Sequence, residues 1–361
     1  MKIALLSYST KPRGGVVHTL HLAEALAALG EDVTVWTLGR GGDTGFFRPV
    51  SPAVRLRIVP FSDSVSGPAD ETVGRRVVRS IATLRDAFDP APYDIVHAQD
   101  CISANAVGRC VRTVHHIDHF TTPELAACHE RAIVEPYAHV CVSAAVAGEL
   151  RAGWALTAEV IPNGVAYERF ATTEPTARAV WRSRLGRYIL TVGGIEPRKG
   201  SLDLLEAYAL LRADHPGVRL VIAGGETLFD YRDYRARWEV RAAELHVEPI
   251  VLGPVPDDEL PALVAAANAF AFPSLKEGFG LAAMEALAAG VPLVVRDLPV
   301  LREVFGPAAH FAATPAQLAT ALGHTLTVDD PARRAAGREL AAAHTWVEAA
   351  RRHLALYRSL H

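Results

Sequence analysis

Residues 273–295 read PSLKEGFGLAAMEALAAGVPLVV. An apolar run at residues 270–272 precedes this stretch, a turn with two glycines follows, and apolar residues then recur at helical spacing from about Leu281 to Gly290. A second apolar run covers residues 292–295. This order predicts a strand, a helix and a parallel strand, which is the repeating unit of sheets covered by helices on both faces.

The same alternation runs through the whole chain of 361 residues. In the first half, the predicted strands cover residues 3–7, 33–38, 94–98, 111–114, 139–143 and 159–161. In the second half, they cover residues 188–192, 219–223, 249–252, 270–272 and 292–295. Between Pro162 and Arg187 the strand pattern lapses into a stretch rich in turn residues, which indicates a domain boundary.

We therefore predict an α/β protein with two Rossmann-like, doubly wound parallel-sheet domains that face a central cleft. The expected domains are residues 1–168 and 188–344, joined by a linker at residues 169–187. A C-terminal helix over residues 345–361 carries apolar residues on one side, and we expect this helix to pack back on the first domain.

Composition narrows the functional class. Formal net charge is only -3, so we expect no nucleic-acid partner. No run approaches the roughly 20 apolar residues that span a bilayer, so we expect peripheral membrane contact at most. The start MKIALLSYS lacks the features of a signal peptide, and the four cysteines match neither a zinc ribbon nor a redox pair. We expect a cytoplasmic protein with reduced, mostly buried cysteines.

The glycine-rich turn before the helix at Leu281 predicts a diphosphate site. Free amides at the start of a helix, placed at the carboxyl end of a parallel strand, favour a bound diphosphate, and Gly278 and Gly280 permit close approach. A carboxylate beside a diphosphate repels it unless the carboxylate faces hydroxyls. We therefore assign Glu277 to sugar hydroxyls and Glu285 to a ribose diol. The alternative is a surface acid and an acid that offsets the helix dipole.

Arg198 and Lys199 follow the strand predicted at residues 188–192. Only four of the 37 basic residues in the chain are lysines, so a lysine in a motif is informative. Two cations at the carboxyl end of a strand predict phosphate binding and neutralisation of a leaving group. The alternative is an exposed pair in a loop, without function.

The first half carries weaker signals. Gly14 and Gly15 follow the first strand and would let the backbone approach a ligand, although GxGxxG is absent and a plain turn is the alternative. In RTVHHIDHF, residues 112–120, His115 ends a strand and is a candidate donor to a sugar hydroxyl or a developing charge. A metal site formed with His116, Asp118 and His119 is disfavoured, because adjacent rings on a strand end point in opposing directions.

His97 and Asp100 end the neighbouring predicted strand, in DIVHAQD. These two residues are candidates to line an acceptor site. A structural polar role is equally favoured for both.

With these motifs, the chain resembles the retaining GT-B glycosyltransferases of glycosyltransferase family 4. The resemblance covers essentially the whole length and is carried by the early Gly-Gly loop, DIVHAQD, TVHH, VIPNGV, EPRKG, EGFG and MEALAAG. It implies metal-independent transfer of a hexose-type sugar from a nucleoside-diphosphate donor, UDP- or GDP-linked, without a cofactor. The implied acceptor is a hydroxyl on a small molecule, a glycan or a lipid-linked compound.

The resemblance also implies roles for individual residues. Glu277 and the backbone around Phe279 and Leu281 would hold the donor sugar and diphosphate, Glu285 the ribose, Arg198 and Lys199 the phosphates, His115 the sugar near its anomeric centre, and Val255 the base through its backbone. One departure is Gly193-Gly194, where many relatives have Gly-Arg. Arg198 is expected to substitute for that arginine.

Other functions on the same fold stay open at this point. One alternative is a nucleotide-sugar epimerase, or a phosphorylase that uses inorganic phosphate as acceptor. The other is a non-catalytic accessory subunit that binds nucleotide sugar; the presence of Glu277, Glu285, Lys199 and His115 together argues against it.

Overall fold

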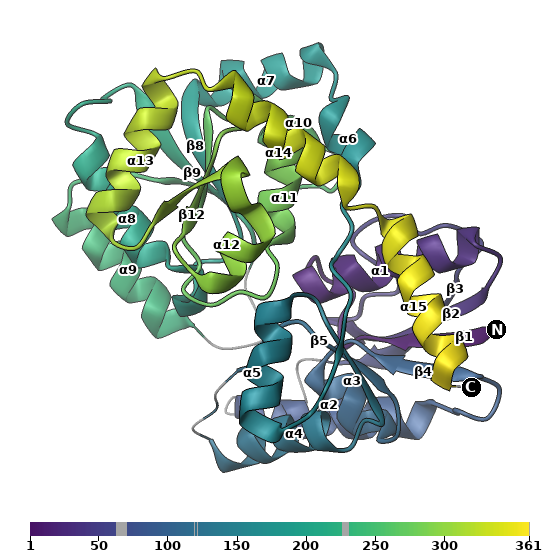
Figure 1. Cartoon of the computed structure of the whole chain (residues 1–361). Helices are drawn as coiled ribbons and strands as arrows, with labels where there is room; N and C mark the ends of the chain where they lie inside the picture. The colour runs from purple at the N-terminus through teal and green to yellow at the C-terminus, as the bar shows by residue number, and fades with distance from the viewer. Residues whose placement is uncertain (63–70, 119, 121, 226–230, 361) are drawn as a thin grey trace. The chain divides into compact units, whose positions relative to one another are not determined.

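The computed structural model describes residues 1–62, 71–118, 120, 122–225 and 231–360. The chain divides into two compact units (Figure 1). Unit 1 consists of Met1–Gly164 and Trp346–His361, and unit 2 of Val165–Thr345. Each unit contains one sheet in which every strand pairing is parallel. The predicted α/β class with two doubly wound sheets is confirmed.

The sheet of unit 1 has the strand order β3-β2-β1-β4-β5-β6-β7. Its strands are β1 (Lys2–Leu6), β2 (Asp32–Arg40), β3 (Arg55–Phe61), β4 (Ile95–Ala98), β5 (Val111–Val114), β6 (Ala138–Cys141) and β7 (Glu159–Val160). Strand β3 was not among the predicted strands. This edge strand has exposed residues at its start, Arg55, Leu56 and Arg57, so it lacks the apolar run of a strand covered on both faces.

The helices of unit 1 cover the two faces of this sheet. They are α1 (Gly14–Ala28), α2 (Val73–Ala87), α3 (Cys101–Val107), α4 (Pro123–Val134), α5 (Ala144–Trp154) and α15 (Trp346–Leu360). Helix α15 lies beside α1 although more than 300 residues separate them in the sequence (Figure 1). It buries the apolar side that its sequence predicts, including Trp346, Leu354 and Tyr357.

The sheet of unit 2 has the strand order β10-β9-β8-β11-β12-β13. Its strands are β8 (Arg187–Val192), β9 (Val218–Ala223), β10 (Ile250–Gly253), β11 (Ala269–Phe272), β12 (Leu293–Arg296) and β13 (Ala309–Ala312). Strand β13 was not among the predicted strands, and its residues AHFA include no β-branched side chain.

The helices of unit 2 include two from the predicted linker. They are α6 (Tyr167–Ala171), α7 (Pro175–Leu185), α8 (Ser201–Leu211), α9 (Arg232–Glu244), α10 (Leu260–Ala266), α11 (Leu281–Ala288), α12 (Pro299–Phe305), α13 (Pro315–Thr327) and α14 (Pro331–Ala343), with short 3₁₀ turns at Pro197–Lys199 and Gly306–Ala308. Helix α7 buries Trp181 and Leu185. Residues 169–187 are therefore folded structure within unit 2, and α6 and α7 both contact α10.

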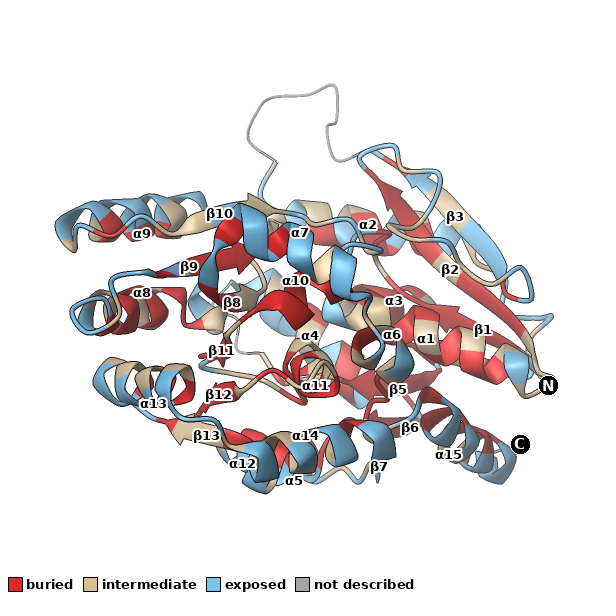
Figure 2. Cartoon of the chain, turned by 90° about the horizontal axis from the view of Figure 1, so that it is seen from above, coloured by how far each residue is buried: buried red, intermediate tan, exposed pale blue. Residues whose placement is uncertain are grey.

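Burial follows the layered order of the sheets and helices. Figure 2 shows buried residues along the central strands and helices that are buried on one side only. In unit 2, Ile189, Leu220 and Ala271 belong to one apolar cluster that also includes Leu205 and Trp238 from the covering helices. Parallel strands with both faces covered give the continuous apolar runs seen in the sequence.

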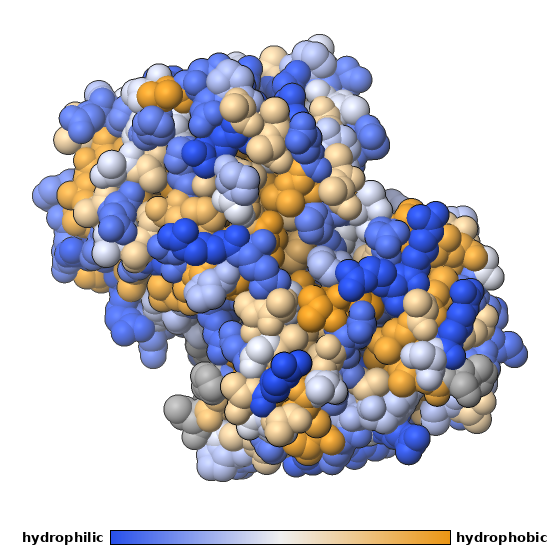
Figure 3. Space-filling model, in the orientation of Figure 1, coloured by the Kyte–Doolittle hydropathy of each residue, from blue (hydrophilic) through white to orange (hydrophobic). Residues whose placement is uncertain are grey.

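The surface and the cysteines fit an ordinary globular chain. Figure 3 shows hydrophilic and hydrophobic residues interspersed on the viewed face of each unit. No helix within the described ranges is long and apolar enough to cross a membrane. All four cysteines are free thiols; Cys110, Cys128 and Cys141 are buried and Cys101 is half-buried, as predicted. Burial raises the pKa of Cys101, Cys110 and Cys141 to about 12, which keeps these groups protonated.

Candidate active site

Two of the predicted motifs meet in unit 2, at the carboxyl ends of β8 and β11. Gly200 follows the Arg198-Lys199 turn with φ 63°, and a Cβ at this position would lie 2.2 Å from the carbonyl oxygen of Pro273. Only glycine fits such a close approach. The amide of Leu275 donates to the carbonyl of Arg198 at 2.8 Å. The EPRKG turn and the PSLKEGFG segment are therefore held against each other.

The charged side chains of these motifs form an ion-paired group, which we call the Lys199 cluster: Glu196, Arg198, Lys199 and Glu277. Lys199 Nζ lies 2.8 Å from Glu277 Oε2, and Arg198 Nη1 lies 3.5 Å from the same oxygen. Arg198 Nη2 lies 3.3 Å from Glu196 Oε1. The cluster thus contains two cations and two carboxylates. Its ammonium also lies 5.2 Å from the ring centroid of Phe272.

Helix α11 begins beside the Lys199 cluster. Gly280 precedes its first residue with φ 99°, and a Cβ there would lie 3.1 Å from the rings of Phe272 and Phe305. No side chain caps this helix start. Uncapped amides at a helix N-terminus carry partial positive charge and favour anions. Gly278 and Phe279 are buried immediately before the helix, so the backbone around them forms a fixed wall.

Glu285 lies one turn further along α11 and is partly exposed. Burial raises the pKa of this carboxyl group to about 7, with Arg169 opposing the shift and Asp257 adding to it. Arg169, on α6, lies 2.8 Å from Asp257 Oδ2. Asp257 follows Val255 by two residues in GPVPDDEL. The predicted ribose acid and the predicted base-contacting segment therefore lie in the same part of unit 2.

Unit 1 gathers four histidines into what we call the imidazole cluster: His18 on α1, His97 on β4, His115 after β5 and His353 on α15. The ring centroids of His18 and His115 are 4.8 Å apart, those of His18 and His353 6.2 Å, and those of His97 and His353 5.7 Å. Gly15 belongs to this neighbourhood, since a Cβ there would lie 3.6 Å from the ring of His115. Gly14 and Gly15 are the first residues of α1 and do not form a separate loop.

The imidazole cluster is electrically neutral at physiological pH. Burial lowers the pKa of His18, His97 and His115 well below the ordinary value, and it lowers the pKa of His353 to about 4. Neighbouring histidines add to the shift for the first three. Within the described residues, the Nε2 atoms of His18, His115 and His353 are buried without a hydrogen-bond partner. The predicted hydrogen bond from His115 to a sugar stays a prediction.

His97 and Asp100 have structural partners. His97 Nδ1 lies 2.6 Å from Tyr357 Oη, and its Nε2 lies 2.7 Å from Thr113 Oγ1. Asp100 caps α3, where its Oδ1 accepts from the Ser103 amide at 2.8 Å. These contacts favour the structural alternative for both residues.

The metal alternative finds no support in the part of the chain that the structure describes. There, no group of three His, Cys, Asp or Glu side chains could hold an ion. His116 Nε2 lies 3.1 Å from Asp118 Oδ2. His119 lies outside the described residues.

Comparison with known proteins places the chain in a family. The family described as Glycosyl transferases group 1 matches residues 176–338, and the one described as Glycosyltransferase Family 4 matches residues 12–169. The D-inositol 3-phosphate glycosyltransferase of Acidothermus cellulolyticus is 30% identical over 338 residues, which cover 81% of this chain and 74% of that protein. The chain belongs to glycosyltransferase family 4. It is an enzyme that transfers glycosyl groups.

Other relatives of this glycosyltransferase match over similar lengths. The MMP alpha-(1->4)-mannosyltransferase of Mycolicibacterium hassiacum is 29% identical over 399 residues, covering 92% of this chain and 91% of that protein. Among solved structures, sucrose-phosphate synthase from Thermosynechococcus elongatus superposes with a TM-score of 0.80 at 22% identity, covering 100% and 99% of the two chains. Anabaena HepE with UDP-glucose has a TM-score of 0.76 at 20% identity, with coverage of 99% and 100%. These likenesses show the GT-B fold.

Sequence reasoning missed three residues near the candidate site of the glycosyltransferase. Glu196 lies in the quoted EPRKG motif, and its position two residues before Arg198 was the available signal. Arg169 fell in the stretch interpreted as a linker, so nothing marked it. Asp257 stood in the quoted GPVPDDEL segment, where we considered only the backbone near Val255.

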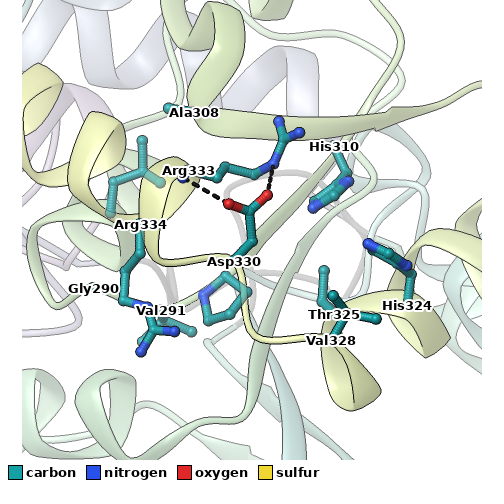
Figure 4. A pocket seen from close by; sticks show the side chains of 12 residues that line it. Gly290, Val291, Ala308, His310, His324, Thr325, Val328, Asp330, Arg333 and Arg334 are labelled. Carbon is teal, nitrogen blue, oxygen red and sulfur yellow. Dashed lines mark hydrogen bonds and ion pairs between the residues drawn. The ribbon is translucent and has the colours of Figure 1, made fainter.

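Unit 2 also has a recess at the amino ends of β12 and β13 (Figure 4). It is lined by residues near the amino ends of β12 and β13, among them Gly290, Val291 and Ala308. Arg333 points at Asp330 there, with Nε 3.1 Å from Oδ2, and donates to the carbonyls of Pro307 and Ala309. Because its cations are already paired and none of the predicted site residues lies in it, this recess is not part of the candidate active site.

Proposed function

We propose that this family 4 member is a retaining, metal-independent transferase that moves a hexose-type sugar from a nucleoside-diphosphate donor to an acceptor hydroxyl. The observation that carries the proposal is the meeting of the Arg198-Lys199 turn with the EGFG segment in unit 2, where Lys199 Nζ and Glu277 Oε2 lie 2.8 Å apart. In this proposal, one diphosphate would contact both Lys199 and the amides at the start of α11.

The Lys199 cluster supports a charge-stabilised departure of the nucleoside diphosphate. In the proposed step, the bond from the anomeric carbon to the diphosphate oxygen breaks and a bond to the acceptor oxygen forms on the same face of the sugar. The acceptor proton passes to the departing phosphate oxygen. Arg198, Lys199 and the α11 amides would stabilise the charge that grows on that phosphate. Glu277 would then accept hydrogen bonds from sugar hydroxyls.

The nucleoside end of the donor would lie near Glu285. A carboxyl group whose pKa is raised to about 7 by burial becomes a good acceptor once the two hydroxyls of a ribose replace the lost hydration. The backbone near Val255 would contact the base, which admits either uracil or guanine. HepE has been solved with UDP and with UDP-glucose, and several relatives are named mannosyltransferases.

Acceptor identity rests on relatives alone. They are named for inositol phosphate and for phosphatidyl-myo-inositol, so both small-molecule and lipid-linked acceptors are reasonable tests. In unit 1, the Nε2 atom of His115 is the proposed hydrogen-bond donor to the sugar, and Gly14 and Gly15 the proposed site of backbone approach. We further propose a cytoplasmic enzyme with peripheral membrane contact at most.

A thermal-unfolding panel tests the donor side. The ligands are UDP, GDP and ADP, each alone and as its glucose or mannose conjugate. We expect one base to raise the unfolding temperature, since a ligand at 100 times its Kd stabilises the native state by about 2.7 kcal/mol. Transfer is then measured with that donor and with inositol phosphate or a lipid-linked acceptor. If none of these nucleotides shifts unfolding, the proposed function is wrong.

The same reagents separate the alternatives. An epimerase converts the donor sugar into its isomer without any acceptor, and a phosphorylase forms sugar phosphate when inorganic phosphate is added. An accessory subunit binds the donor and shows neither transfer nor slow hydrolysis. Each outcome is read by chromatography of the sugar products, and any of them in place of transfer contradicts the proposal.

A further inference from the structure

A small recess lies behind Lys199, at the carboxyl ends of β8, β9 and β11. We call it the Lys199 recess, and its lining consists of Thr191, Val192, Gly193, Gly194, Lys199, Ser201, Leu204, Ile222, Phe272, Pro273 and Ser274. Gly193 and Gly194 contribute no side chains, so the recess stays open on their side. Gly193 is itself packed against Gly224, where a Cβ would lie 2.4 Å from its backbone.

Two serines with opposite hydroxyl environments line the Lys199 recess. Ser201 Oγ donates to the carbonyl of Glu196 at 3.3 Å and lies 3.1 Å from Tyr234 Oη. Ser274 is only 1% exposed, and its Oγ has no hydrogen-bond partner among the described residues. A buried hydroxyl without a partner costs folding free energy, so an alanine at position 274 would be the more stable choice.

The residues that line the Lys199 recess indicate the kind of ligand that the Ser274 hydroxyl would bind. Among the described residues, Lys199 is the one charged group that lines the recess, and no carboxylate of that part of the chain does. Apolar side chains of Leu204, Ile222 and Phe272 form much of the remaining wall, which lowers the local dielectric constant and strengthens charge-assisted hydrogen bonds. An ammonium and a free hydroxyl in such a wall suit an oxyanion. The contact of Lys199 with a carboxylate oxygen of Glu277 is a contact of that kind.

We propose that Ser274 is a phosphate-binding residue of the donor site, whose hydroxyl donates to the same phosphate group that Lys199 binds. This inference rests on the proposed function, because the phosphate belongs to the nucleoside diphosphate. It explains why the segment after β11 keeps a buried hydroxyl at a cost in stability. Ser274 thereby adds a neutral donor to the charged donors Arg198 and Lys199.

The experiment compares Ser274→Ala with Ser201→Ala, a matched change in the same recess. Unfolding temperature is measured without ligand, and the Kd of the preferred nucleoside diphosphate by calorimetry. We expect Ser274→Ala to unfold at the same temperature as the wild type or higher, and to bind the diphosphate roughly 10-fold or more weakly. We expect Ser201→Ala to unfold at a lower temperature, with its Kd within about twofold of the wild type. Ser274→Cys keeps a weak donor and should fall between.

Each possible result either supports or overturns the proposed role of Ser274. A Ser274→Ala variant that binds the diphosphate as the wild type does would overturn the role of Ser274 and leave the proposed function intact. A loss of stability with unchanged affinity would show a purely structural hydroxyl and would also overturn it. If the wild-type protein binds no nucleoside diphosphate, the proposed function and this inference fall together, and that result is recognisable without any variant.

Discussion

The imidazole cluster of unit 1 and the Lys199 cluster of unit 2 both lie near the carboxyl ends of the strands of their sheets. They differ in charge and in hydrogen-bond partners. In the imidazole cluster, burial lowers the pKa values until the rings are neutral, and three ring nitrogens remain without partners among the described residues. In the Lys199 cluster, two basic and two acidic side chains pair with one another. Neutral rings can offer hydrogen bonds to uncharged hydroxyls, whereas paired charges can exchange a partner for a charged ligand.

The largest expected effect is on catalysis, from Lys199→Ala. Removing one pre-organised donor to a developing charge costs about 10²–10³ in kcat, so we expect turnover to fall at least 100-fold. Circular dichroism should show an intact fold. The control is Lys276→Ala, four residues after the end of β11 and without an ion pair to a described residue. If both variants turn over at the wild-type rate, Lys199 does not stabilise the leaving phosphate in the reaction.

Acid should weaken unit 1 through His353. Its pKa is about 4 in the folded chain and near 6.5 when unfolded, so the unfolded state takes up the proton first. The stability that this ring contributes is complete above pH 6.5 and is lost as the pH falls toward 4. From pH 7.5 to pH 5 we expect a loss of about 2 kcal/mol from this group alone.

Urea unfolding at the two pH values measures this loss, and amide exchange of residues 346–360 localises it. His353→Leu should reduce the pH dependence, since it removes the titrating ring. His215→Leu, in unit 2, is the control. An unchanged pH dependence in His353→Leu would mean that the ring is charged or exposed in solution, and the contrast between the two clusters would disappear.

The parts of the fold that the sequence predicted are those where one periodicity decides the structure. Strand β11 is apolar throughout, and β1 is apolar after Lys2, because both faces are covered; that pattern is visible without coordinates. Strand β3 was not predicted from the sequence because an edge strand tolerates charged residues such as Arg55 and Arg57, which break the apolar run. The folded α6 and α7 were interpreted as a linker because their turn residues outweighed the weak helical pattern.

For the candidate site, the sequence named the residues but not their partners. The strand-turn-helix order brought Lys199 and Glu277 into the same prediction, because carboxyl ends of parallel strands share one edge. The pairing of Glu277 with Lys199 depends on how the two segments pack. The close approach of Gly200 to Pro273 brings the segments together, and no sequence pattern shows that contact. The imidazole cluster depends on helix α15 returning to unit 1, and the ring contacts of His353 have no local sequence signal.

Glu285 is expected to affect stability less than His353 does, and to lower it as the pH rises instead of as the pH falls. Its pKa of about 7 lies above the unfolded value near 4.5, so the folded state holds the proton more tightly. Stability therefore falls as the pH rises from 4.5 through 7, and the charged carboxylate is unfavourable at pH 8. We expect Glu285→Gln to stabilise the ligand-free chain at pH 8 by about 1 kcal/mol, allowing for its partial exposure, and to change little at pH 5.

Urea unfolding of Glu285→Gln at pH 5 and pH 8 checks this, with nucleotide binding measured alongside. The same variant should bind the nucleoside diphosphate more weakly, because a neutral amide is a poorer acceptor for the ribose hydroxyls. Glu168→Gln, on neighbouring α6, serves as control. A variant as stable as the wild type at pH 8 would show that this carboxylate is well solvated, like an ordinary surface acid.

The smallest expected effect comes from Lys11 in unit 1, which is also ion-paired. Lys11 Nζ lies 2.8 Å from Asp43 Oδ2, the same separation as between Lys199 and Glu277. Lys11 has a side chain 49% exposed, whereas the Lys199 side chain is 20% exposed. Water screens the exposed pair, and such pairs contribute about 0–1 kcal/mol.

Lys11→Ala should therefore change the free energy of unfolding by less than about 1 kcal/mol at low salt and by even less at 1 M salt. A loss of several kcal/mol would mean that distance alone decides the strength of these pairs, and that the lower exposure of Lys199 does not set its pair apart from that of Lys11.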